Sequence, residues 1–111
     1  MSLDSREKGK RYEREIANWL KEHGYDARRT AQYCGNTGDA SDVVGLPGIH
    51  IECKHVERAN LHAWVDQAIR DSEGTGNLPC VFWKQNRMPQ LVIMRRDDWL
   101  KLYEGVSDGM D

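Results

Sequence analysis

Two carboxylates and one lysine, Asp42, Glu52 and Lys54, lie close to a predicted tight turn in the middle of the sequence. Runs rich in β-branched residues flank Leu46-Pro47-Gly48, a pattern typical of a β-hairpin. With Pro47 at the midpoint, Asp42 pairs directly with Glu52, and such partners have Cβ atoms about 4.5–5.5 Å apart on one face. Strand alternation places Lys54 on that same face. The sequence therefore predicts two opposed carboxylates with an ammonium group beside them.

This arrangement is suited to metal-assisted chemistry on a phosphate. Two carboxylates held so close repel each other, and a shared divalent cation would explain their placement. Hard oxygen ligands favour Mg²⁺, with Mn²⁺ as a substitute, over zinc. Such an ion activates water and neutralises charge on a phosphate, while Lys54 would orient the attacking water or stabilise the transition state. The alternative is an ordinary cross-strand ion pair of Lys54 with one carboxylate, which contributes little.

The cysteines indicate a reducing compartment. Three cysteines without C-x-x-C spacing exclude a disulfide scaffold. Cys53 and Cys80 lie in apolar stretches and are interpreted as core residues. A zinc site built from Cys34, Cys53 and His55 is the minor alternative, because its spacing matches no known pattern.

Three helices are predicted around these residues. Residues 4–23 carry an apolar stripe at helical spacing, formed by Tyr12, Ile16, Trp19 and Leu20. Residues 60–71 form a second helix, capped by Asn60, with a buried side formed by Leu61, Trp64, Val65, Ala68 and Ile69. A closing helix, residues 97–103, is expected to bury Trp99, Leu100 and Tyr103.

Five strands complete the predicted order α-β-β-β-α-β-β-α. They cover residues 25–32, 42–45, 49–54, 79–83 and 90–94. Ile49, Ile51 and Cys53 are expected to point into the core, opposite to Glu52. The pattern indicates an α/β fold with a mixed sheet and helices on its faces.

Length and composition indicate one globular domain, residues 1–111, with an acidic tail from about residue 104. The chain is 39% hydrophobic and 31% charged, with a net charge of -2. No segment has the roughly 18 uninterrupted apolar residues of a membrane helix, and the first residues lack a hydrophobic signal core. We therefore expect a soluble, intracellular protein.

The motif of Asp42, then nine residues, then Glu52-Cys53-Lys54 resembles the PD-(D/E)XK nuclease superfamily, and within it the archaeal and phage Holliday-junction resolvases. Further matching motifs occur in the same order over residues 6–96, namely Gly9–Glu15, Gly24-Tyr25 with Arg28-Arg29-Thr30, Ser41–Val44 and Ile51–Lys54. Two features depart from the family pattern. Ser41 replaces the superfamily's proline, and the chain is slightly acidic whereas archaeal resolvases are markedly basic.

The resemblance implies a restriction-endonuclease-like fold and a metal-dependent DNA endonuclease. Asp42 and Glu52 would bind the metal together with the Cys53 carbonyl, and Lys54 would be the catalytic lysine. Glu13 would reach the site from the first helix, with Glu15 as the less favoured candidate.

Three further residues near the motif are candidates for the site, and the first two have two interpretations each. Gln67 either lies beside the catalytic lysine, as in many superfamily members, or is a solvated helix residue. His50, on the carboxylate face, is interpreted as a support residue, with a place near the scissile phosphate as the alternative. Asp39, three residues before Asp42, is a candidate substitute for a metal ligand, although it falls in the loop.

The expected partner is branched or duplex DNA, bound by a homodimer because one small domain offers limited surface. The predicted DNA-binding residues lie in the basic first helix and the strand after it: Lys8, Lys10, Arg11, Arg28, Arg29 and Thr30. Two alternatives remain. One is a phage or mobile-element nuclease acting on duplex or other DNA, and the other is a non-catalytic DNA-binding module of the same fold.

Overall fold

The structure, a computed structural model, describes residues 5–30 and 41–109, with side chains as far as residue 105. The candidate ligands Cys34 and Asp39 lie outside the described residues. None of the helices in the described ranges combines the length and apolarity that crossing a membrane requires.

A single five-stranded mixed sheet organises the molecule. Its spatial order follows the chain, β1-β2-β3-β4-β5. The strands are β1 (Arg28–Arg29), β2 (Val43–Val44), β3 (Ile49–His55), β4 (Leu78–Lys84) and β5 (Leu91–Ile93). Among these strands of the described residues, only the β3–β4 pair is parallel. A parallel pair needs a crossover connection, and α2 (Leu61–Ser72) supplies it. The predicted order of elements and the mixed sheet are confirmed.

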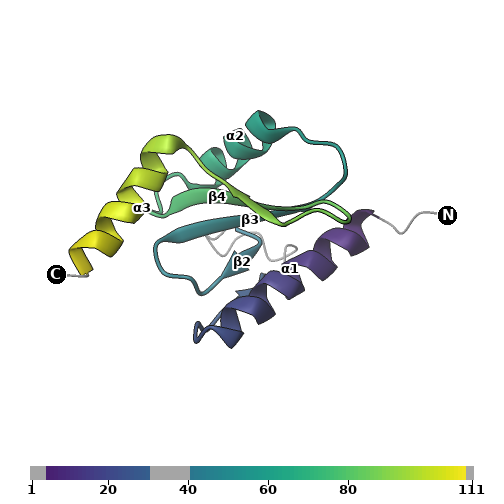
Figure 1. Ribbon diagram of the computed structural model, residues 1–111, viewed down its shortest axis with the longest axis horizontal. Helices are drawn as coiled ribbons and strands as arrows, with labels where there is room; N and C mark the ends of the chain where they lie inside the picture. Colours follow the sequence, from purple (N-terminus) through teal and green to yellow (C-terminus); the bar gives the residue numbers. More distant parts are fainter. Residues whose placement is uncertain (1–4, 31–40, 110–111) are drawn as a thin grey trace.

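Two helices cover opposite faces of the sheet, α1 (Ser5–Glu22) on one and α2 on the other (Figure 1). The larger core lies under α1, where Tyr12 and Ile16 pack with Ile51 and Cys53 of β3. The smaller core lies under α2, where Trp64 and Ala68 pack with Val81 and Trp83 of β4. Because side chains alternate along a strand, the residues of β3 between those of the larger core face α2. These are His50, Glu52 and Lys54.

Several predicted details of the first helix and strand are wrong. Trp19 is 45% exposed, and Ala17 completes the buried stripe of α1 instead. The strand predicted from residue 25 begins only at Arg28. Tyr25, the first residue of the predicted strand, instead belongs to the turn that ends α1, since its N–H donates to the Leu20 carbonyl at 3.1 Å.

The second helix also differs from the prediction. On its predicted buried side, Leu61 is exposed, and the Asn60 side chain makes no capping hydrogen bond.

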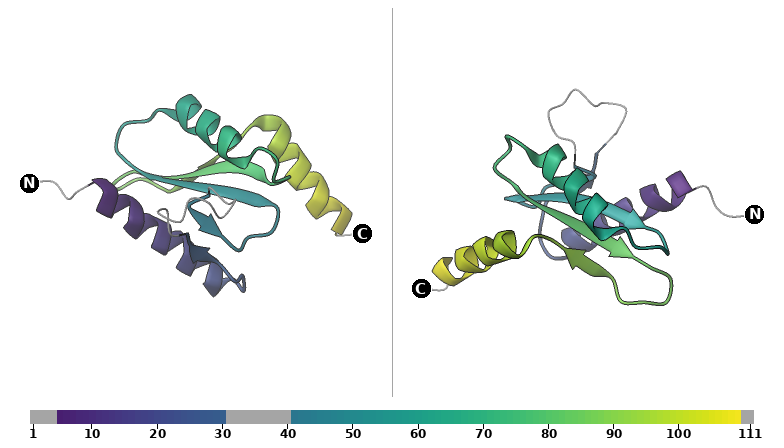
Figure 2. Two further views of the ribbon diagram at one scale, coloured as in Figure 1. Left: turned by 180° about the vertical axis from the view of Figure 1, so that it is seen from behind. Right: turned by 90° about the horizontal axis from the view of Figure 1, so that it is seen from above.

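The last helix, α3 (Arg96–Gly109), does not bury the residues that its sequence pattern suggests. Trp99 is 54% exposed, and Leu100 and Tyr103 are also exposed. The physical reason is that α1 and α2 already occupy both faces of the sheet, so α3 projects away from the sheet (Figure 2). The acidic segment from residue 104 is helical as far as Gly109.

Candidate active site

The hairpin brings the two predicted carboxylates together in the expected register. Val43 pairs with Ile51, so the preceding residue Asp42 lies opposite Glu52. The Cys53 N–H donates to Asp42 Oδ2 at 2.8 Å. Both carboxylates are buried, and Asp42 is held directly on the backbone of β3.

Glu52 lies in a crowded acidic environment. It is 3% exposed, and its Oε2 lies 2.7 Å from Nε2 of His50, which is 2% exposed. Burial raises the pKa of Glu52 to about 7; the hydrogen bond with His50 opposes this shift, and the nearby charges of Asp42 and Asp71 add to it. Burial and the two neighbouring carboxylates therefore favour the protonated form of Glu52 in the metal-free protein.

Lys54 and Gln67 are in contact, as one interpretation of Gln67 requires. Lys54 Nζ donates to Gln67 Oε1 at 3.3 Å, from β3 to α2. Both side chains are partly buried. This contact places Gln67 beside the predicted catalytic lysine and disfavours its interpretation as a solvated helix residue.

The structure distinguishes the two glutamates of α1. Glu13 is buried and accepts a hydrogen bond from Arg29 Nε at 2.7 Å. Burial and the neighbouring Asp42 raise the pKa of Glu13, while Arg29 opposes the shift. Glu15 instead accepts hydrogen bonds from Lys84 at 2.7 Å and from Gln90 at 2.8 Å. Of the two, Glu13 is therefore the one whose charge acts on Asp42.

The predicted DNA-binding residues separate into two kinds. Arg29 is paired with Glu13, and the Thr30 hydroxyl donates to the Ser41 carbonyl at 2.7 Å, so both are engaged within the fold. Arg11 and Arg28 are exposed, Lys8 is partly exposed, and Lys10 lies 3.8 Å from Glu7 in an i,i+3 ion pair. The exposed arginines are the better candidates for phosphate contacts.

The cysteine alternative gains no support from the described residues. Cys53 and Cys80 are buried, as expected for core residues. Burial strongly raises the pKa of the Cys53 thiol, which disfavours the thiolate that zinc binds. His55 lies beside Asn86, with 3.3 Å between Nε2 and Oδ1.

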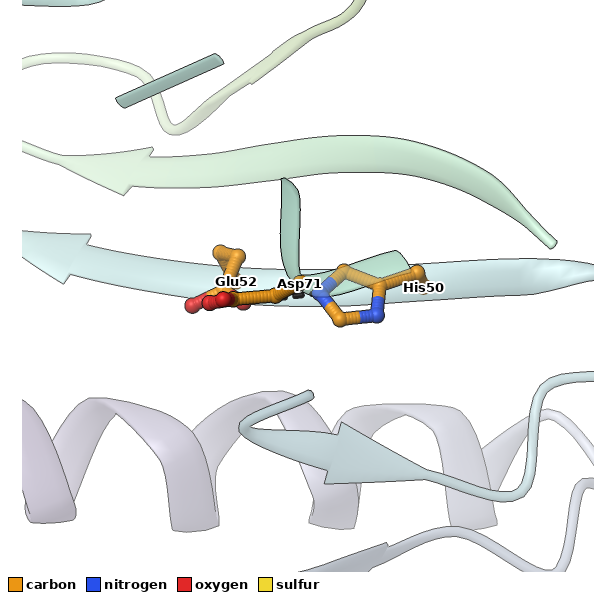
Figure 3. Close-up of side chains that lie close together, drawn as sticks. All are labelled: His50, Glu52 and Asp71. Carbon is orange, nitrogen blue, oxygen red and sulfur yellow. Dashed lines mark hydrogen bonds and ion pairs between the residues drawn. The ribbon is translucent and has the colours of Figure 1, made fainter. Parts of the chain in front are cut away.

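Asp71, which no sequence motif singled out, approaches Glu52 from the facing helix. Asp71 comes from α2, and one ligand atom from each of His50, Glu52 and Asp71 lies within 4.8 Å of the others (Figure 3). Among the described residues, no other group of three His, Cys, Asp or Glu side chains has its potential ligand atoms this close together. The signal of Asp71 in the sequence was its i,i+4 spacing from Gln67.

Comparisons with known proteins identify the family and the fold of the chain. The family model described as "Phage putative PDDEXK endonuclease" matches residues 4–110. The fold is similar to that of Hjc, a Holliday junction resolvase from the archaeal hyperthermophile Archaeoglobus fulgidus, with a TM-score of 0.58 and 24% sequence identity. The similarity covers 76% of this chain and 73% of Hjc, which confirms the predicted restriction-endonuclease-like fold. No curated protein gives a significant match.

Proposed function

The chain belongs to the family of phage PD-(D/E)XK endonucleases, and we propose that it is a Mg²⁺-dependent deoxyribonuclease that cleaves branched DNA. The observation that carries this proposal is the hairpin register, which sets Asp42 opposite Glu52 with Lys54 on the same face of the sheet. The raised pKa values of Glu13 and Glu52, each due to burial and in part to Asp42, indicate that three carboxylates share one region.

These residues fit a hard divalent cation. Asp42 and Glu52 offer carboxylate oxygens, the ligand type that Mg²⁺ and Mn²⁺ prefer, and the Cys53 carbonyl is the third proposed ligand. When bound there, such an ion lowers the pKa of water and neutralises charge on the phosphate. Positive charge would also reduce the mutual repulsion of the carboxylates.

The protein's own side chains have distinct proposed roles in hydrolysis. Lys54, held by Gln67, orients the attacking water and stabilises negative charge on the phosphate. A bond forms between the water oxygen and phosphorus, and the bond from phosphorus to the 3′ oxygen breaks. The 3′ oxygen takes up a proton, which leaves a 3′-hydroxyl and a 5′-phosphate. Glu13, held in place by Arg29, reaches the site from α1 on the side of Asp42, either directly or through a metal-bound water.

The proposed substrate class is branched DNA in the cytoplasm of a bacterial, archaeal or phage-infected cell. The fold similarity to a Holliday junction resolvase supports this choice. The test is a cleavage assay with Mg²⁺ that offers a four-way junction, a flap, linear duplex and single-stranded DNA at equal concentrations. Preferred cleavage of the junction supports the proposal. Preferred cleavage of duplex supports a general phage nuclease, and binding without cleavage supports a non-catalytic module.

Variants separate catalysis from folding. Lys54→Ala and Asp42→Asn should each abolish cleavage and leave the thermal unfolding of the metal-free protein within a few degrees of wild type. Lys21→Ala, an exposed lysine of α1, is the matched control and should cleave normally. Retained cleavage in Lys54→Ala would contradict the proposed role.

We also propose that two copies of the chain assemble through α3. Trp99 and Tyr103 stack on each other with ring centroids 5.8 Å apart, and both are exposed together with Leu100 and Leu102. The same patch on two chains is self-complementary around a twofold axis. Such a dimer would offer two active sites to the two sides of a branched substrate.

A further inference from the structure

The group of His50, Glu52 and Asp71 lies next to the residues assigned to catalysis but extends beyond them. His50 and Glu52 are two residues apart on β3 and therefore face the same side, toward α2. Asp71 reaches them from α2 (Figure 3). None of the proposed catalytic steps uses His50 or Asp71.

The crossover connection explains why these three residues meet. A helix between two parallel strands runs antiparallel to them, so α2 passes β3 in the opposite direction. Gln67 contacts Lys54. Asp71 lies four residues further along α2, which is about one turn and about 6 Å along the helix axis. The step from Lys54 back to Glu52 along β3 is about 6.6 Å. The two spacings match, so Asp71 comes opposite Glu52.

The atoms are spaced for a shared ion. The three ligand atoms lie within 4.8 Å of one another. Donors on opposite sides of an ion with bonds of about 2.1 Å are about 4.2 Å apart, so small side-chain rotations bring all three onto one ion. His50 and Glu52 are almost completely buried, and Asp71 is half-buried, so the position is screened from bulk water.

We propose that His50, Glu52 and Asp71 form a second divalent-cation position, which takes a first-row transition-metal ion such as Mn²⁺ in preference to Mg²⁺. An imidazole nitrogen with two carboxylates is a ligand set that transition ions accept readily, whereas Mg²⁺ favours oxygen ligands alone. This inference rests on the proposed function in one respect, since Glu52 would be a ligand shared by this second ion and the ion held with Asp42.

The alternative role of His50 is purely positioning, in which its hydrogen bond only holds the Glu52 carboxylate. Asp71 decides between the two. A positioning role has no need of a second carboxylate, which repels Glu52. A metal position requires that carboxylate as a ligand. The two roles therefore differ in the effect of neutralising Asp71.

The test is Mn²⁺ binding to the DNA-free protein. Electron paramagnetic resonance measures it, because the spectra of free and bound Mn²⁺ differ. Wild type should bind two Mn²⁺ ions, and the spin-echo spectrum should show coupling to a nitrogen nucleus. His50→Gln and Asp71→Asn should each lower the affinity for one of the two Mn²⁺ ions by at least tenfold. His50→Gln should also remove the nitrogen coupling. His62→Gln, an exposed histidine of the same helix, is the control and should bind as wild type does.

Asp42→Asn distinguishes this inference from the proposed function. If both are right, the variant loses one Mn²⁺ ion and keeps the one with nitrogen coupling. If Asp42→Asn changes nothing while His50→Gln does, the proposed catalytic metal fails and the second position stands. If neither His50→Gln nor Asp71→Asn alters binding, or if no nitrogen coupling is present in wild type, the inference is wrong. Thermal unfolding in EDTA checks that each variant is folded. If His50→Gln does not fold, Asp71→Asn tests the inference in its place, because Asp71 is less buried than His50.

Discussion

The protonation of Glu52 should link the stability of the metal-free protein to pH. Burial, together with the charges of Asp42 and Asp71, raises the pKa of Glu52 from its ordinary 4.5 to about 7, against the opposing hydrogen bond with His50. Since the pKa is higher in the folded state, the folded protein binds more protons than the unfolded chain between these two values. The resulting stabilisation is complete below about pH 4.5 and is lost as the pH rises through about 7.

The magnitude follows from the width of this window. Each pH unit within it removes about 1.4 kcal/mol of unfolding free energy, so wild type loses up to about 3 kcal/mol. Glu52→Gln carries a neutral side chain of the same shape and does not lose this contribution. For a chain of this size, about 3 kcal/mol corresponds to roughly 10 °C in Tm.

The assay is thermal unfolding by circular dichroism in EDTA, at several pH values between about 5 and 8. The Tm of Glu52→Gln should be close to that of wild type at the acidic end and roughly 10 °C higher at the basic end. Glu22→Gln, an exposed residue of α1, should follow wild type throughout. A difference between wild type and Glu52→Gln that does not change with pH, or that favours wild type more as the pH rises, would refute the reasoning.

Three further predictions concern other parts of the molecule. Replacing exposed Arg28 with Ala should reduce the slope of log affinity for DNA against log salt by about one, whereas Lys101→Ala should leave it unchanged; equal slopes in all three proteins would move the DNA-binding face elsewhere. Gly45→Ala should lower the unfolding free energy by roughly 3 kcal/mol in chemical denaturation, because Gly45 has φ +106° and a Cβ there would clash with the Asp26 carbonyl oxygen. Near wild-type stability would contradict this close approach. Leu102→Glu on α3 should shift the protein from dimer to monomer in analytical ultracentrifugation, and an unchanged mass would exclude α3 as the interface.

The hairpin of the candidate active site could be predicted from local sequence because its geometry is local. A short turn at Pro47 and the two-residue period of strands are enough to bring Asp42 opposite Glu52, and the structure has the same register. The contact between Lys54 and Gln67 was also within reach, since a similar pair is known from the family that the motif resembles.

The last helix shows where sequence patterns stop being informative. Trp99, Leu100 and Tyr103 have the spacing of a buried helix face, but hydrophobic periodicity does not specify what the face packs against. In the structure both faces of the sheet are already covered, and these side chains remain exposed.

The glutamate of α1 and the third ligand of the proposed second metal position were decided by tertiary structure. Glu13 and Glu15 are two residues apart, so they point to different sides of α1, and only the docking of the helix determines which one approaches Asp42. Asp71 is 19 residues from Glu52 in the sequence. It meets Glu52 because the crossover sets the direction of α2 and core packing sets its rotation about its axis, and both depend on contacts between residues distant in the chain.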